Sequence, residues 1–220
     1  QNYEFVLKKS IGKGKYFHWL ASDDTRSLNF LEENISYLEN NHDYIASCSL
    51  KYFGSVSKFQ KNNKNFKIDQ ETEHKRINML LDNIWQSHSI FCSVIRTNVI
   101  KKCQYLGEHY LAQDWTINTF LAKNGKIALQ NNSHIIIGEK GVSKTNPFKP
   151  FRLFWIEYFI PLYSFHKRFS IIISNLNFVD KKKLEIKIIS LHLFTMRILF
   201  INFVKKIIKI FFKDNLKIIK

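Results

Sequence analysis

The chain has 220 residues, of which 34 are basic and 18 acidic, and its formal net charge at pH 7 is +16. Hydrophobic residues make up 45% and aromatic residues 15%, so the composition excludes general disorder, and the length allows a substantial core. The three cysteines form no C-x-x-C pair, which argues against a disulfide framework or a structural zinc site and favours a reducing compartment.

The positive charge raises the question of a nucleic-acid partner, because Lys and Arg neutralise phosphates. The sequence contains no zinc-finger, helix-turn-helix or RNP-like segment. Lys, Asn, Ile and Phe are frequent throughout, as an AT-biased coding sequence would produce, and the lysines near the C-terminus alternate with long apolar runs. We therefore expect no nucleic-acid partner and, in its place, an anionic membrane surface.

Hydrophobic periodicity predicts alternating helices and strands. In chain order we expect a helix over residues 2–10, a strand over 16–21, a helix over 28–38, a strand over 44–52, a loop over 58–67, a helix over 77–85, a strand over 89–96, a short helix over 98–103, a helix over 115–123 and a strand from residue 126. The loop is either a solvated excursion or a basic lip over a sugar or phosphate site. This alternation predicts an α/β sheet.

Two adjacent carboxylates, Asp23 and Asp24, follow the first expected strand directly. Ligands of open α/β sheets gather at the carboxyl ends of strands, and aspartate oxygens suit Mg²⁺ or Mn²⁺ that is shared with substrate phosphates. The alternative is a solvated Asp-Asp turn that caps the helix expected over residues 28–38.

A longer pattern surrounds these aspartates, and a second block lies downstream. The first runs Gly14-Lys15-Tyr16-Phe17-x-Trp19-x-Ala21-x-Asp23-Asp24, with Asn2-Tyr3-Glu4-Phe5-Val6-Leu7 before it and Phe30-Leu31 after it. The second runs Ile90-Phe91-Cys92-Ser93-Val94-Ile95-Arg96-Thr97, then Gln113-Asp114-Trp115, then Leu121-Ala122-x-x-Gly125-Lys126-Ile127-Ala128. Together the two blocks resemble the GT-A domain of family 2 glycosyltransferases, with its metal-binding turn, G-L-F-R-T strand, acidic helix start and L-x-x-x-G-K turn.

The resemblance implies a Rossmann-like nucleotide-diphospho-sugar transferase (GT-A) domain over residues 1–150. The family's first βαβ unit, which grips the nucleotide base, has no counterpart here, and the chain opens at Gln1 without an initiator Met. We therefore expect a domain that is truncated at its N-terminus and inactive, or nearly so, on its own.

The resemblance also assigns roles to side chains. Asp24 would hold Mn²⁺ or Mg²⁺ against the leaving diphosphate, and Asp23 would touch the metal hydration shell or the ribose. Asp114 matches the base of inverting family members, although its residue type and position alone favour an N-cap. Arg96 and Trp115 are the further substrate-binding residues we expect.

Residues 151–220 form a second expected region, which is basic, aromatic-rich and helical. The apolar run over residues 188–204 contains His192 and Arg197 and is shorter than the roughly 20 residues that span a bilayer, so spanning is disfavoured. From Lys205 onward the lysines share one helical face, which predicts a helix lying in the membrane interface. The alternative is that this helix docks on the catalytic domain or on a second subunit.

These observations predict an inverting, metal-dependent glycosyltransferase of the hexosyl type, peripheral on the cytoplasmic face of the membrane and active in polysaccharide biosynthesis. It would move a sugar from a nucleotide-sugar donor to a cell-surface glycan or a lipid-linked acceptor. The alternative is a non-catalytic basic membrane-binding protein on a degenerate transferase fold. An enzyme needs Asp24 and Asp114 near one cleft, whereas a binding module does not.

Overall fold

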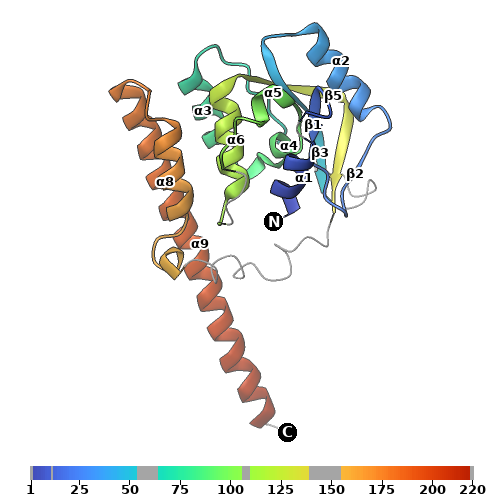
Figure 1. Ribbon diagram of the computed structural model, residues 1–220. Helices are drawn as coiled ribbons and strands as arrows, with labels where there is room; N and C mark the ends of the chain where they lie inside the picture. Colours follow the sequence, from blue (N-terminus) through green and yellow to red (C-terminus); the bar gives the residue numbers. More distant parts are fainter. Residues whose placement is uncertain (1, 11, 54–63, 106–109, 139–154, 219–220) are drawn as a thin grey trace.

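The computed structural model describes residues 2–10, 12–53, 64–105, 110–138 and 155–218. The chain folds as a mixed α/β protein with a five-stranded, strongly curled sheet and a long C-terminal helix (Figure 1). This confirms the expected α/β class. The domain boundary expected at residue 150 and most of the loop expected over residues 58–67 lie outside the described residues.

The sheet has the strand order β1-β4-β3-β5-β2. Its strands are β1 (Tyr16–His18), β2 (Thr25–Arg26), β3 (Tyr44–Phe53), β4 (Val94–Arg96) and β5 (Lys126–Ile137). The long central strands β3 and β5 pair in parallel, and the other three pairings are antiparallel. Residues 45–49 of β3 are all buried, which is the pattern of a strand covered on both faces.

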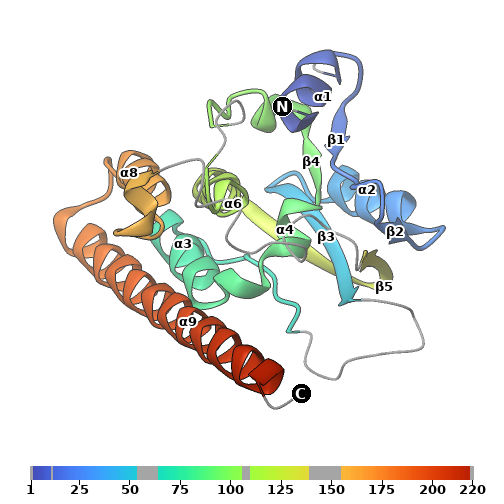
Figure 2. The ribbon, with the colours of Figure 1, turned by 90° about the horizontal axis from the view of Figure 1, so that it is seen from below.

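Helices α2 (Phe30–Asn40) and α4 (His88–Phe91) lie on opposite faces of this sheet (Figure 2). The Asn34 amide of α2 donates a hydrogen bond to Ser49 Oγ, whereas the neighbouring residue of β3, Cys48, interacts with Ser89 of α4. Successive side chains of a strand point to opposite faces, so these two contacts place the helices on different sides.

Several further helices complete the α/β body of the protein. The helices are α1 (Asn2–Ser10), α3 (Glu73–Asp82), the 3₁₀ turn η1 (Ile84–Gln86), α5 (Thr97–Ile100) and α6 (Gln113–Asn124). Arg76 of α3 fastens α3 to the end of α6, because its guanidinium donates to the carbonyls of Ala122 and Lys123 at 2.8 and 3.0 Å and to those of Gln70 and Glu71 at 3.1 and 2.8 Å. Four carbonyls satisfied by one buried cation make a rigid corner.

The C-terminal region contains the 3₁₀ turn η3 (Trp155–Tyr158) and helices α8 (Tyr163–Ile172) and α9 (Phe178–Ile218). Phe165 and Phe169 of α8, with Leu184 and Ile188 of α9, are buried in the same core as the sheet. Asn177 directly precedes α9, and its Oδ1 accepts from the Asp180 backbone N–H at 3.0 Å, as an N-cap side chain does. The C-terminal half of α9 extends away from the α/β body (Figure 1).

One side of α9 remains apolar and exposed although the opposite side is docked. Its large exposed side chains include Ile186, Ile189, Leu193, Met196, Phe200 and Phe203. In the part of the chain that the structure describes, no helix combines the length and the hydropathy needed to cross a membrane. This agrees with the expectation that spanning by residues 188–204 is disfavoured.

Three local predictions are wrong. The strand expected over residues 16–21 ends at His18, because the chain enters a turn in which the Asp24 N–H donates to the Ala21 carbonyl at 3.2 Å. Leu28 is fully exposed, since α2 begins at Phe30, two residues later than its apolar spacing indicated. Residues 89–91 are helical rather than extended, and only residues 94–96 of that apolar run form a strand.

Candidate metal-binding site

Asp24 is buried in the turn between β1 and β2, whereas its neighbour Asp23 is exposed. The backbone N–H of Gly138, the residue after β5, donates to Asp24 Oδ1 at 2.9 Å. Helix α2 has Asn29 at its N-cap, so neither aspartate caps it, and the capping alternative is wrong. The turn instead directs the Asp24 carboxylate into the protein.

Gly138 holds this turn in a second way, by having no side chain. A Cβ at this position would lie 2.5 Å from the Asp23 carbonyl oxygen and 2.3 Å from Asp23 Oδ2. Real Cβ atoms do not approach backbone oxygen so closely, because the overlap is repulsive. The end of β5 and the aspartate turn therefore fit together only with glycine at this position.

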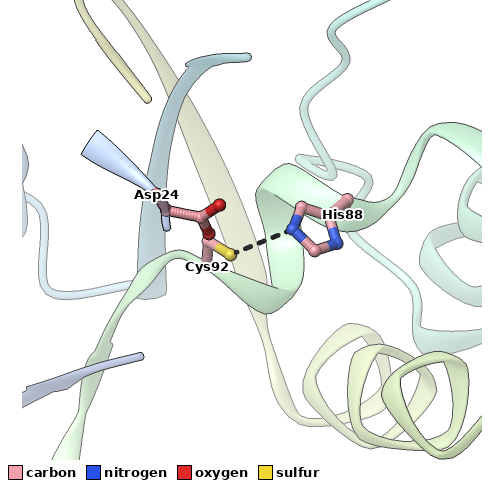
Figure 3. Close-up of side chains that lie close together, drawn as sticks. All are labelled: Asp24, His88 and Cys92. Carbon is pink, nitrogen blue, oxygen red and sulfur yellow. Dashed lines mark hydrogen bonds between the residues drawn. The ribbon is translucent and has the colours of Figure 1, made fainter. Parts of the chain in front are cut away.

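Two further side chains meet Asp24 from helix α4 and the residue just after it. His88 and Cys92 are four residues apart, and Cys92 Sγ lies 3.5 Å from His88 Nε2 (Figure 3). One ligand atom each of Asp24, His88 and Cys92 lie within 4.8 Å of one another. No other group of three such side chains with this spacing occurs among the described residues. Carboxylate, imidazole and thiol together are the donors of a transition-metal site.

The position of His88 and Cys92 is set by hydrogen bonds from helix α6. The Asn118 side chain, fully buried, donates to both the carbonyl and the hydroxyl of Ser87, each at 3.0 Å. The Ser87 hydroxyl in turn donates to the Ile84 carbonyl at 2.7 Å. These bonds fix the start of α4 and therefore the direction of the His88 ring.

The electrostatics of the cluster argue against an activated cysteine nucleophile. Burial raises the pKa of the Cys92 thiol well above its ordinary value, and the carboxylates of Asp24 and Asp114 raise it further. Burial also lowers the pKa of His88, and nearby Asp24 opposes that change only in part. The pair is therefore a thiol and a neutral imidazole, whereas a nucleophilic Cys–His pair requires a thiolate.

Asp114 lies in the first turn of α6, two residues after the N-cap residue Ala112. Burial raises its pKa to about 6, while hydrogen bonds from the backbone of Trp115 and of Asp114 itself oppose the shift. The charges of Asp24 and Asp114 both raise the pKa of the Cys92 thiol, although Asp114 is not one of the three side chains whose ligand atoms lie close together. The backbone bonds to Asp114 are those expected of a carboxylate at a helix start.

Two residues that the sequence analysis did not single out also belong to this neighbourhood. Lys51 of β3 is fully buried, and its ammonium donates to the Gln86 carbonyl at 2.9 Å. Burial lowers the pKa of Lys51 to about 8 and that of His18, which lies near Asp24, to about 4. Lys51 could have been found from the sequence, because it lies in the strand expected over residues 44–52 and lysine is rarely buried without a partner.

The other expected substrate residues lie elsewhere in the fold. Arg96 is the last residue of β4 and pairs with Tyr16 of β1, whereas Cys92 lies just before the other end of β4. Its guanidinium donates to the carbonyls of Tyr44 and Leu38 at 2.8 and 2.5 Å. A depression of about 360 Å³ beside Arg96, also lined by Lys15 and Lys101, is thus separate from the metal-binding cluster.

Trp115 is engaged in aromatic packing. Its ring meets Trp85 edge-on at a centroid distance of 4.8 Å and Phe165 at 5.9 Å. These contacts join α6 to the η1 turn and to α8, so the ring serves the packing of helices.

Comparisons with known proteins add no assignment. No family model matches the sequence, and no curated protein matches it either. The resemblance to family 2 glycosyltransferases therefore rests only on the residues quoted for it.

Proposed function

We propose that the chain is the acceptor-side part of a GT-A glycosyltransferase domain, which transfers a sugar with inversion from a nucleotide-sugar to a glycan or lipid-linked acceptor. The observation that carries this proposal is the buried cluster of Asp24, His88 and Cys92, which joins the carboxylate of the first matched sequence block to a cysteine of the second. The charge of Asp114, 90 positions from Asp24 in the sequence, also raises the pKa of the Cys92 thiol.

The two carboxylates take different roles in this mechanism. Asp24 lies in the turn between β1 and β2 and would hold a divalent cation, which when bound would supply positive charge to neutralise the leaving diphosphate. Asp114, with its pKa raised to about 6 by burial, is ionised at neutral pH yet basic enough to accept the proton of the acceptor hydroxyl as that oxygen attacks the anomeric carbon. Attack from the face opposite the diphosphate inverts the anomeric centre.

Two variants test this assignment in the complete gene product, of which this chain is all or part. Asp24→Ala should abolish metal-dependent binding of a nucleoside diphosphate, measured by calorimetry with and without EDTA. Asp114→Asn should leave that binding intact and lower turnover about a hundredfold or more, because it removes the base and preserves the shape. Full turnover in the Asp114→Asn variant would refute the proposal.

The exposed apolar side of α9 supports a peripheral position on an anionic membrane surface. Phe200, Phe203 and Val204 are exposed there, and Lys205 follows them directly. Such a helix lies in the headgroup boundary with its aromatic and aliphatic side chains in the acyl region and its lysines toward anionic lipids. The lysine face expected from Lys205 onward lies mostly outside the side chains that the structure describes.

Liposome flotation tests this position. Deletion of residues 200–220 keeps the docked residues Leu184, Ile188 and Thr195 and removes the projecting part of α9. The truncated protein should remain folded and fail to float with anionic vesicles, while wild type floats. Equal flotation of both proteins would exclude the projecting part of α9 as the membrane contact. Loss of flotation in a truncated protein that still transfers sugar would show that membrane binding and catalysis are separate. Flotation without any transfer by the complete gene product would favour the non-catalytic membrane-binding alternative.

A further inference from the structure

We infer that Asp24, His88 and Cys92 are three ligands of a site for a borderline transition-metal ion, foremost Zn²⁺. The site departs from the Mn²⁺ or Mg²⁺ that the sequence pattern around Asp24 predicts. It includes two ligands, His88 and Cys92, that the sequence pattern does not assign to any metal.

The distances agree with tetrahedral zinc. Zinc–sulfur and zinc–nitrogen bonds of about 2.3 and 2.05 Å at a tetrahedral angle place the two donors about 3.6 Å apart. Cys92 Sγ and His88 Nε2 are 3.5 Å apart. The carboxylate oxygen would lie about 3.3–3.5 Å from each of them in such a site. Since all three donors already lie within 4.8 Å of one another, Asp24 needs to approach by at most about 1.5 Å.

The donor chemistry selects the ion. Mg²⁺ takes oxygen ligands in an octahedron and has little affinity for a thiolate or an imidazole, so Asp24 alone would serve it. Zn²⁺ binds all three donor types. On binding, the Cys92 S–H bond breaks, its proton leaves to solvent, and a zinc–sulfur bond forms. One carboxylate, one thiolate and one Zn²⁺ sum to zero charge, which suits a buried position.

The surroundings already support such a site. The Gly138 N–H donates to Asp24 Oδ1, as outer hydrogen bonds do for metal-binding carboxylates, and Asn118 fixes the start of the helix that carries His88. Three protein ligands leave a fourth position open, which is the arrangement of catalytic rather than structural zinc. That this position takes an oxygen of the donor diphosphate rests on the proposed function, whereas metal binding itself does not.

Cobalt(II) provides the direct test, because it takes the place of zinc and reports its ligands by colour. Titration of the metal-free 220-residue chain with Co²⁺ should produce a thiolate-to-cobalt charge-transfer band in the near ultraviolet and visible bands of tetrahedral intensity. Zn²⁺ should remove both, millimolar Mg²⁺ should not, and binding should release about one proton per ion. X-ray absorption of the zinc-loaded wild type should show one sulfur at about 2.3 Å.

The chain offers matched controls for the ligand assignment. Cys92→Ser and His88→Gln should weaken Zn²⁺ binding more than about a hundredfold, the loss of a ligand exceeding that of an outer partner. Cys48→Ser and Cys103→Ser also replace buried cysteines, which lie outside the cluster, and should bind as wild type does.

Two results would overturn the inference, and neither depends on a folding defect. One is an X-ray absorption spectrum of the zinc-loaded protein that shows only oxygen and nitrogen scattering. The other is a thiolate-to-cobalt charge-transfer band that persists in Cys92→Ser. Sugar transfer that is absent although the cobalt site forms would instead count against the proposed function alone.

Discussion

Replacing Gly138 with Ala should loosen the aspartate turn and destabilise the protein. The added methyl group would lie 2.5 Å from the Asp23 carbonyl oxygen and 2.3 Å from Asp23 Oδ2, and the backbone oxygen cannot rotate away as a side chain can. Overpacking of this kind costs about 1–3 kcal/mol. Separation of β5 from the turn also weakens the Gly138 N–H···Asp24 Oδ1 hydrogen bond, and a bond to a charged acceptor contributes about 1.5–3 kcal/mol. We expect a total loss of about 2.5–6 kcal/mol in the free energy of unfolding.

Urea denaturation followed by far-ultraviolet circular dichroism measures this loss, with Gly14→Ala as the control. A Cβ at Gly14 meets only the Tyr16 carbonyl oxygen, at an ordinary 3.4 Å, so this variant should stay within about 0.5 kcal/mol of wild type. Cobalt affinity should fall in Gly138→Ala and not in Gly14→Ala, because only the former moves Asp24. If both variants unfold at the same urea concentration as wild type, the close fit of β5 against the turn is not a feature of the protein in solution.

Three further predictions concern the neighbourhood of the cluster. Asn118→Ala should lower the free energy of unfolding by about 1–3 kcal/mol, because the Ser87 carbonyl loses its buried donor. It should also weaken cobalt binding about 10- to 100-fold, because Asn118 positions the helix that carries His88. Unchanged cobalt affinity would contradict this positioning role. Because burial lowers the pKa of Lys51 from 10.5 to about 8, the unfolded chain binds this proton at higher pH than the folded protein does. The free energy of unfolding should therefore fall as the pH decreases from 10.5 to about 8, by an amount on the order of 3 kcal/mol, and urea titrations should show this dependence in wild type and not in Lys51→Met. Turnover of the complete gene product should rise through an ionisation near pH 6, where burial places the pKa of Asp114, and a pH profile that is flat from 5 to 8 would exclude Asp114 as the base.

The elements that the sequence predicts best are those fixed by local signals. Helix α6 ends at Asn124 and is followed by Gly125, as the Asn-Gly pair indicated, because helix termination depends on residues within one turn. Strand β3 covers the expected residues, although its run of consecutive buried side chains departs from the alternation expected of it. That run reflects coverage by helices on both faces, a tertiary fact that a single strand does not encode.

Helix α4 shows why the sequence does not predict two of the three ligands of the candidate metal site. The run Ile90-Phe91-Cys92-Ser93-Val94-Ile95 is apolar without a period, and periodicity cannot distinguish a strand from a short buried helix in such a run. In a strand, residues 88 and 92 would lie about 13 Å apart, too far to share an ion. One helical turn brings the two side chains to 3.5 Å. The ligand pair therefore depends entirely on a local conformation that is set by packing against α6 and β3.

The free-energy cost of burying charged groups at the cluster is itself an argument that the cluster has a function. Asp24, Asp114 and Lys51 are charged groups, and burial shifts the pKa values of Asp114 and Lys51 in the direction that disfavours their charged forms. Buried ionisable groups seldom stabilise a fold, and apolar residues of similar size often do so better. A chain with a core built from Ile, Leu and Phe has simpler ways to fill the space between α4, α6 and β3. A carboxylate beside a thiol and an imidazole becomes favourable when a cation enters between them, and binding of a metal is the event that offsets the free-energy cost.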